Sequence, residues 1–271
     1  MHCESGFATI KKMSVNRIGG FYMNDAKAQI ENEQDLHEGI QNFISQLEGL
    51  DNYRLPQRAY HIMRLAIRDL VLFPGKTILE KEMADILQMS RTPVREALVR
   101  LETEGMVHLI PRRGFTVEPI EKNDLREIYE IAQIMEGFAV EKATDRIEDR
   151  EIQQLELLIH KQEKAIEQKD LRLWSYLDDQ FHHLIIEFAK NKRLNTIIDI
   201  HSDQLYRARL YTINKRPLPL QSITEHKAII SCMRAGEGSA ARMVMQSHRK
   251  RARVEILEAL DKMNESLTSG A

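Results

Sequence analysis

Apolar residues recur at helical spacing in the segment that follows Ser90. Val94, Ala97, Leu98 and Leu101 stand at positions i, i+3, i+4 and i+7, so they form one apolar stripe of a helix. Ser90 is expected to cap this helix through its hydroxyl, and a proline at position 93 is tolerated because it falls in the first turn. The pattern predicts a short helix with one buried face.

Three polar residues share the first turn of this helix and lie off its apolar stripe: Arg91, Thr92 and Arg95. Guanidinium groups at such a position reach base edges in the major groove, and the helix N-terminus favours phosphate. The turn therefore predicts a helix that reads DNA.

The flanking segments complete a DNA-binding motif. Residues 79–89 have a small apolar face of Met83, Ala84 and Leu87, and Gln88-Met89 is a short turn, so the two helices form a helix-turn-helix. Gly105 ends the second helix in the left-handed conformation that favours glycine. Short strands are expected at 107–110 and 115–117. The hairpin between them is a wing that carries Arg112, Arg113 and Gly114, and Lys81 near the start of the first helix is a further candidate phosphate contact.

The rest of the chain is almost entirely helical in pattern. Residues 1–33 show little periodicity and are interpreted as a poorly ordered leader. An amphipathic helix is expected within 34–50, with two candidate roles, extending a dimer interface or covering the reader domain, and another helix is expected over 54–73. After Pro119 the pattern predicts an antiparallel bundle with helices near 122–145, 149–168, 170–190, 193–213, 220–235 and 238–265.

Charge and composition agree with a DNA-binding domain attached to a regulatory body. Residues 54–118 hold 11 Lys and Arg against 8 Asp and Glu, whereas the segments on either side are net negative, as is the whole chain at −2. Two cysteines in 271 residues give no disulfide framework and suit a cytoplasmic protein. No apolar run reaches the length needed to span a membrane, and no phosphate loop or dinucleotide fingerprint is present.

Four polar residues of the bundle carry a second candidate site. Asp178 and His182 are i, i+4 on one expected helix, and His226 and His248 are equidistant from residue 237 in the turn between two consecutive helices. Three imidazoles and one carboxylate that converge in this way predict a transition-metal site with open positions. A rival register exists, because Asp179 and His183 are also i, i+4, about 100° round the same helix.

The reader segment resembles the GntR family of bacterial transcription regulators. The resemblance covers roughly 55–117 and is carried by Ser-Arg-Thr-Pro-Val-Arg-Glu-Ala-Leu from residue 90, by Arg-Leu-Glu-Thr-Glu-Gly from residue 100, and by Arg-Arg-Gly-Phe from residue 112. The bundle resembles the FCD effector domain of the FadR-type branch, through Leu177-Asp178, Phe181-His182, Asn191, Glu225-His226 and Gln246-Ser247-His248.

This resemblance implies a divalent metal held by one Asp and three His, which binds small carboxylate effectors. The matching positions are Asp178, His182, His226 and His248, whereas His183 and His201 match none. Metal-binding members carry an arginine four residues before a glutamate, and that arginine pairs with the effector. The matching glutamate here is Glu136, but position 132 is alanine. Either the effector lacks this carboxylate clamp, or another residue supplies it, for which Arg207 and Arg209 on the fourth bundle helix are the candidates.

We therefore expect a mainly α protein with an extension over 1–53, a winged helix-turn-helix over 54–118 and an all-helical effector domain over 119–271. Its expected function is that of a ligand-responsive repressor, not an enzyme, which binds a palindromic operator as a homodimer and responds to a small organic acid. The expected cofactor is Zn²⁺, with Ni²⁺ and Mn²⁺ as alternatives. Two other hypotheses stay open: a metal-dependent hydrolase with an attached DNA-binding-like domain, and a direct metal sensor.

Overall fold

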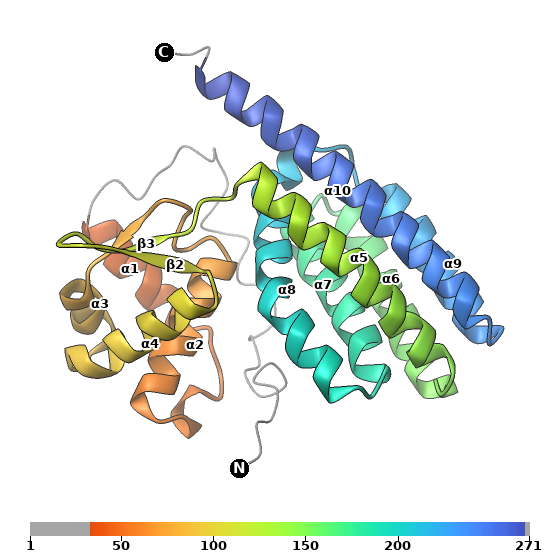
Figure 1. The fold of residues 1–271 in the computed structure, drawn as a ribbon, viewed down its shortest axis with the longest axis horizontal. Helices are drawn as coiled ribbons and strands as arrows, with labels where there is room; N and C mark the ends of the chain where they lie inside the picture. Colours follow the sequence, from red (N-terminus) through yellow and green to blue (C-terminus); the bar gives the residue numbers. More distant parts are fainter. Residues whose placement is uncertain (1–32, 269–271) are drawn as a thin grey trace. The chain divides into compact units, whose positions relative to one another are not determined.

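The computed structural model describes residues 33–268, and these form two compact units that meet in sequence between Pro119 and Ile120 (Figure 1). The first is a winged helix-turn-helix and the second an all-helical domain, so the expected fold class is confirmed. None of the helices within 33–268 is long and apolar enough to cross a membrane.

The first unit packs four helices against a small antiparallel sheet. The helices are α1 (Glu33–Ile44), α2 (Leu55–Arg68), α3 (Glu80–Leu87) and α4 (Arg91–Thr103), and a 3-10 turn, η2, spans Leu50–Asn52. The strands β1 (Thr77–Ile78), β2 (Val107–Ile110) and β3 (Gly114–Val117) lie in the order β1-β3-β2. Ile78 pairs with Phe115, and Val107 pairs with Val117.

Helix α1 belongs to the core of this unit. Its apolar residues Leu36, Ile40 and Phe43 are buried in the same cluster as α2, α3 and α4. The side-chain amide of Gln41 donates a hydrogen bond to the carbonyl of Ile86, near the end of α3. Of the roles considered for this helix, the structure shows that it covers the reader domain.

Two expectations about helix ends were wrong. Helix α2 ends at Arg68 rather than near Phe73, because Leu70 adopts a left-handed conformation with φ 58° and the Val71 amide bonds back to the Ala66 carbonyl. Ser90 is the N-cap of α4, but its side chain makes no capping hydrogen bond. The helix starts there because the extended backbone at Ser90 and Pro93 in the first turn both suit a helix N-terminus.

The second unit is a bundle with short connections. Its helices are α5 (Lys122–Thr144), α6 (Asp149–Glu167), α7 (Leu171–Phe188), α8 (Lys192–Thr212), α9 (Leu220–Arg234) and α10 (Gly238–Thr268), with a 3-10 turn, η3, at Ile213–Lys215. Helix α10 packs along α5 and α9, and α6 packs on α7 and α9 (Figure 1). The Asp170 carboxylate caps α7, and the Asn191 side chain caps α8.

Candidate functional sites

The reader helix α4 buries one face and leaves its first turn exposed. Val94, Leu98 and Leu101 are fully buried, which fixes the rotation of the helix about its axis. The turn between α3 and α4 is tight because Gln88 takes a left-handed conformation with φ 53°. Consequently Arg91, Thr92 and Arg95 face solvent on one side of the domain.

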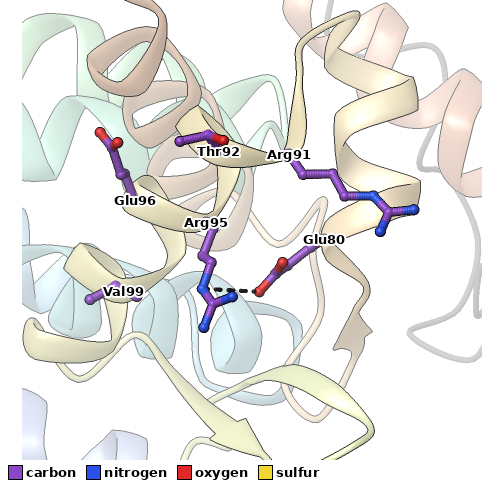
Figure 2. Close-up of a pocket in the computed structure, with 6 residues that line it drawn as sticks. All are labelled: Glu80, Arg91, Thr92, Arg95, Glu96 and Val99. Carbon is purple, nitrogen blue, oxygen red and sulfur yellow. Dashed lines mark ion pairs between the residues drawn. The ribbon is translucent and has the colours of Figure 1, made fainter.

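These three side chains line a hollow at the surface, together with Glu80, Glu96 and Val99 (Figure 2). Arg95 Nε lies 3.8 Å from Glu80 Oε1, whereas Arg91 extends away from that pair (Figure 2). An exposed arginine held by a carboxylate at this distance exchanges its partner readily, because surface ion pairs contribute little to stability. The hollow therefore offers two guanidinium forks and a hydroxyl to a base edge or phosphate.

The wing presents two further cations. Arg112 and Arg113 are exposed at the turn between β2 and β3, and Lys81 is exposed near the start of α3. Gly114 has a φ of 94°, and a Cβ built there would lie 2.6 Å from the Ile78 carbonyl oxygen. Among the residues expected to contact DNA, Gly114 thus has a clear backbone role: only glycine lets β1 approach the base of the wing.

The histidine cluster lies inside the bundle. Asp178 and His182 come from α7, His226 from α9 and His248 from α10, and all four side chains are buried. One ligand atom from each histidine lies within 4.8 Å of the other two. Asp178 joins them, with Oδ1 3.6 Å from His226 Nε2 and Oδ2 3.9 Å from His182 Nε2.

Two of the histidine rings are held from behind through Nδ1. His248 Nδ1 donates to Glu225 Oε2 at 2.7 Å, and that carboxylate also accepts two hydrogen bonds from Arg251. His226 Nδ1 lies 3.2 Å from Gln162 Oε1, whose amide nitrogen donates to the Leu177 carbonyl. Because an oxygen faces each Nδ1, the proton resides there and Nε2 keeps its lone pair.

The remaining two members of the cluster lie next to charged side chains. His182 Nδ1 lies 2.9 Å from Glu136 Oε2, and both oxygens of Glu136 accept from Arg249, at 2.6 and 2.8 Å. Asp178 Oδ2 lies 2.8 Å from Arg209 Nη1. Each of the helices α5 to α10 thus places at least one side chain in or against the cluster.

The inward-facing atoms are left without partners. Within 33–268, Asp178 Oδ1, His226 Nε2 and both ring nitrogens of His182 are buried and make no hydrogen bond, although Glu136 lies close to His182 Nδ1. Burial lowers the pKa of all three histidines, that of His226 to about 3. Burial alone would raise the pKa of Asp178, but the Arg209 guanidinium and the histidines hold it below its usual range. Neutral imidazoles beside an ionised carboxylate are the protonation states that a divalent cation requires.

The rival register does not reach this cluster. His183 Nε2 lies 3.3 Å from Glu187 Oε1 on its own helix, and His201 Nδ1 lies 3.4 Å from Gln204 Oε1. Of the two candidate arginines, the structure brings Arg209 to Asp178. Arg207 is two residues earlier on α8 and projects about 200° away, so the two arginines cannot serve the same site.

Sequence reasoning missed the residues that hold the rings, although one left a signal. Gln162 continues a stripe formed by Leu155, Ile159 and Ile166, and it is fully buried. A polar residue on an otherwise apolar helix face needs a buried partner, which here is His226.

Comparisons with known proteins agree with both units. Residues 55–117 match the model described as "Bacterial regulatory proteins, gntR family", and residues 127–251 match the FCD domain. The HTH-type transcriptional repressor RspR of Escherichia coli K12 is 30% identical over 192 residues, which cover 71% of this chain and 84% of RspR. The chain belongs to the GntR family of transcriptional regulators.

Other members of the GntR family show the same relationship. The Nta operon transcriptional regulator of Aminobacter aminovorans is 30% identical over 187 residues, covering 69% of this chain and 87% of that protein. The solved structure of E. coli McbR/YncC has a TM-score of 0.68 at 22% identity and covers 76% of this chain and 98% of its own. A putative GntR regulator from Rhodococcus sp. RHA1 has a TM-score of 0.65 at 21% identity, over 75% and 98% of the two chains. The structural likeness shows the shared fold.

Proposed function

We propose that this GntR regulator is a repressor that binds a palindromic operator as a homodimer and responds to a small organic acid at a metal site in the bundle. Asp178, His182, His226 and His248 would hold a divalent cation, with Zn²⁺ the first choice because imidazole-rich sites suit it. When bound, the ion supplies a Lewis-acid centre for an oxygen of the effector.

One observation carries the metal proposal: Asp178 Oδ1 and the Nε2 atoms of His182 and His226 make no hydrogen bond inside the cluster, while Asp178, His226 and His248 are each held from the opposite side. Buried polar atoms without hydrogen bonds are costly, so their accumulation at one point favours binding of a cation there. Glu136, Gln162 and Glu225 contact the three Nδ1 atoms and orient the rings, a role that such partners commonly have around metal ligands.

The dimer proposal is supported by the reader domain and by α5. A single reader helix contacts few bases, and two copies double the contacts on a two-fold operator. Ile131, Ile134 and Phe138 stand at i, i+3 and i+7 on α5 and are 41%, 61% and 37% exposed, which makes an apolar stripe suited to self-association. Ile134→Asp should give a monomer by light scattering and weaken operator binding.

Metal analysis of purified protein tests the site. His226→Ala and His248→Ala should each lower metal content sharply, whereas His183→Ala and His201→Ala should not. The first pair should still bind operator DNA, because the reader domain has its own core, but should lose the response to effector. A His226→Ala, His248→Ala double variant that keeps stoichiometric metal would show that the bundle senses its ligand in another way.

The same preparations separate the two other hypotheses. Turnover of esters or lactones by the metal-loaded protein would favour a hydrolase. Operator affinity that follows metal occupancy without any organic acid would favour a direct metal sensor.

A further inference from the structure

The hollow beside the reader helix continues past the first turn of α4. Thr92, Arg95 and Val99 stand at i, i+3 and i+7, and all three line it (Figure 2). At about 1.5 Å per residue these positions span roughly 10 Å of helix, which corresponds to about three base pairs when the helix lies along a groove. The hollow is therefore long enough to meet more than the base that Arg95 contacts, and Val99 forms its far end.

Val99 is the apolar member of a lining that is otherwise polar or charged. It is 47% exposed, although it is a β-branched aliphatic residue in the middle of a helix. The fully buried Leu98 and Leu101 fix the rotation of α4 so that Val99 points outward. Its methyl groups are thus presented to whatever enters the hollow.

The next residue along the helix is a cation, but it is held elsewhere. Arg100 Nε donates to Glu104 Oε1 at 3.1 Å, and the Arg100 guanidinium lies 3.6 Å from the centre of the Tyr60 ring. The Tyr60 hydroxyl in turn donates to the same carboxylate, 2.8 Å from Glu104 Oε2. Because Arg100 is engaged on that side of the helix, the side chain available one turn after Arg95 is Val99.

The formal charges that line the hollow balance. Arg91 and Arg95 contribute positive charges, and Glu80 and Glu96 contribute negative charges. Phosphate groups favour a surplus of cations, whereas base edges in the major groove are uncharged and present donors, acceptors and, at thymine, a methyl group. A balanced lining with an apolar end therefore suits base edges better than the DNA backbone.

A valine in the major groove can favour thymine through direct contact. Its side chain neither donates nor accepts, so a carbonyl, ring nitrogen or amine covered by it loses water without gaining a hydrogen bond. The C5-methyl group of thymine loses nothing and is removed from water. We propose that Val99 is a specificity-determining residue that packs against the C5-methyl group of a thymine, within about two base pairs of the base that Arg95 contacts. The proposal rests on DNA binding through α4 and is independent of the metal site and the effector.

Replacement of single thymines by uracil tests this contact, because uracil lacks only the C5-methyl group. Full-length protein first selects duplexes from a randomised pool. Each thymine of the selected sequence is then replaced in turn, and the affinity is measured by fluorescence anisotropy. At one thymine, near the base pair whose discrimination is lost in Arg95→Ala, the wild type should bind about fourfold more weakly, the value of one buried methyl group.

Val99→Ala removes the contact and leaves the helix intact. The position is exposed and alanine favours helix, so the variant should melt no lower than the wild type. It should bind the selected duplex more weakly, and uracil at the responsive thymine should then cause no further loss. Such coupling between one side chain and one methyl group is not expected from a change in stability. Leu157→Ala, which shortens an aliphatic side chain of similar exposure on α6, should keep the wild-type response at every thymine.

Three results would each overturn the role of Val99: a selected sequence without thymine near the Arg95 position, a wild type that tolerates uracil at every thymine, or an equal uracil effect in the wild type and Val99→Ala. Arg95→Ala on the same duplexes keeps this proposal apart from the assignment of α4 as the reader helix. Loss of base discrimination in Arg95→Ala, together with an unchanged thymine response in Val99→Ala, would refute the role of Val99 and leave that assignment standing.

Discussion

Arg209 Nη1 lies 2.8 Å from Asp178 Oδ2, and both side chains are buried between α7 and α8. Arg209→Met leaves the Asp178 carboxylate buried without its cation. The metal-free variant should lose about 3–5 kcal/mol of unfolding free energy, measured by urea denaturation. Arg234→Met is the control, because it breaks an exposed ion pair with Glu156 and should cost only about 0–1 kcal/mol. Equal losses would contradict the importance of the buried pair.

The buried histidines predict a dependence of stability on pH. Burial lowers the folded-state pKa of His226 from 6.5 to about 3, so the unfolded chain binds the proton more tightly. The stability of metal-free protein should be complete above about pH 6.5 and should fall as pH decreases towards 3, by about 1.4 kcal/mol per pH unit for each such histidine. Denaturant titrations at several pH values between neutral and mildly acidic should show that the unfolding free energy of His226→Gln falls less steeply with decreasing pH than that of the wild type. His160 is exposed, so His160→Gln is the control and should show the same pH dependence of unfolding free energy as the wild type. The same pH dependence in all three proteins would contradict the contribution of His226.

The exposed first turn of α4 predicts loss of sequence discrimination. Arg91→Ala and Arg95→Ala should each cost about 1–3 kcal/mol of specific operator binding without changing fold or metal content. Fluorescence anisotropy with operator and scrambled duplexes measures the difference. Lys161→Ala, on the exposed face of α6, is the matched control. If both arginine variants still discriminate between operator and scrambled duplexes as the wild type does, the first turn of α4 does not read the DNA sequence.

The exposed cations of the wing should affect DNA affinity and its salt dependence rather than sequence discrimination. Arg112→Ala and Arg113→Ala should weaken binding evenly across sequences and reduce the slope of log affinity against log salt by about one each, because each removes one phosphate contact. Lys81→Ala should behave in the same way. A salt slope that stays at the wild-type value would place these cations away from the DNA.

Two glycines with similar backbone angles should respond differently to alanine. Gly114 and Gly75 have φ values of 94° and 79°, but only at Gly114 would a Cβ meet backbone, 2.6 Å from the Ile78 oxygen. Both substitutions carry the strain of a positive φ, about 1–2 kcal/mol. Gly114→Ala should melt lower than Gly75→Ala and bind DNA more weakly, because β1 and β3 must separate. Similar melting temperatures would mean that the sheet adapts.

The structure shows why some features followed from the sequence and others did not. The helices of the bundle follow from apolar periodicity, and the i, i+4 spacing of Asp178 and His182 is local geometry. The choice of Arg209 over Arg207 depends on how α8 is rotated against α7, which no local pattern specifies. Glu225 accepts hydrogen bonds from His248 and Arg251 on α10, so its role depends on the packing of α9 against α10.

The reader domain gives a parallel case. Gly105, with φ 67°, ends α4 as its sequence context predicted. Leu70 adopts a similar conformation without being glycine, because the backbone bonds to the Ala66 carbonyl and the burial of Val71 and Leu72 impose it. The apolar stripe of α1 was visible in the sequence, but its partner was not, since that depends on a cluster assembled from α2, α3 and α4.

The cluster draws on every helix of the second unit: Glu136 from α5, Gln162 from α6, Asp178 and His182 from α7, Arg209 from α8, His226 from α9 and His248 from α10. Local opening of any one of these helices would remove a ligand or the partner that orients one. Anything bound at this point is therefore released whenever one helix opens, and its binding opposes the opening of all of them. Binding at the cluster would therefore slow amide hydrogen exchange along the whole bundle, including α5, α6 and α8, which supply no ligand to the cluster.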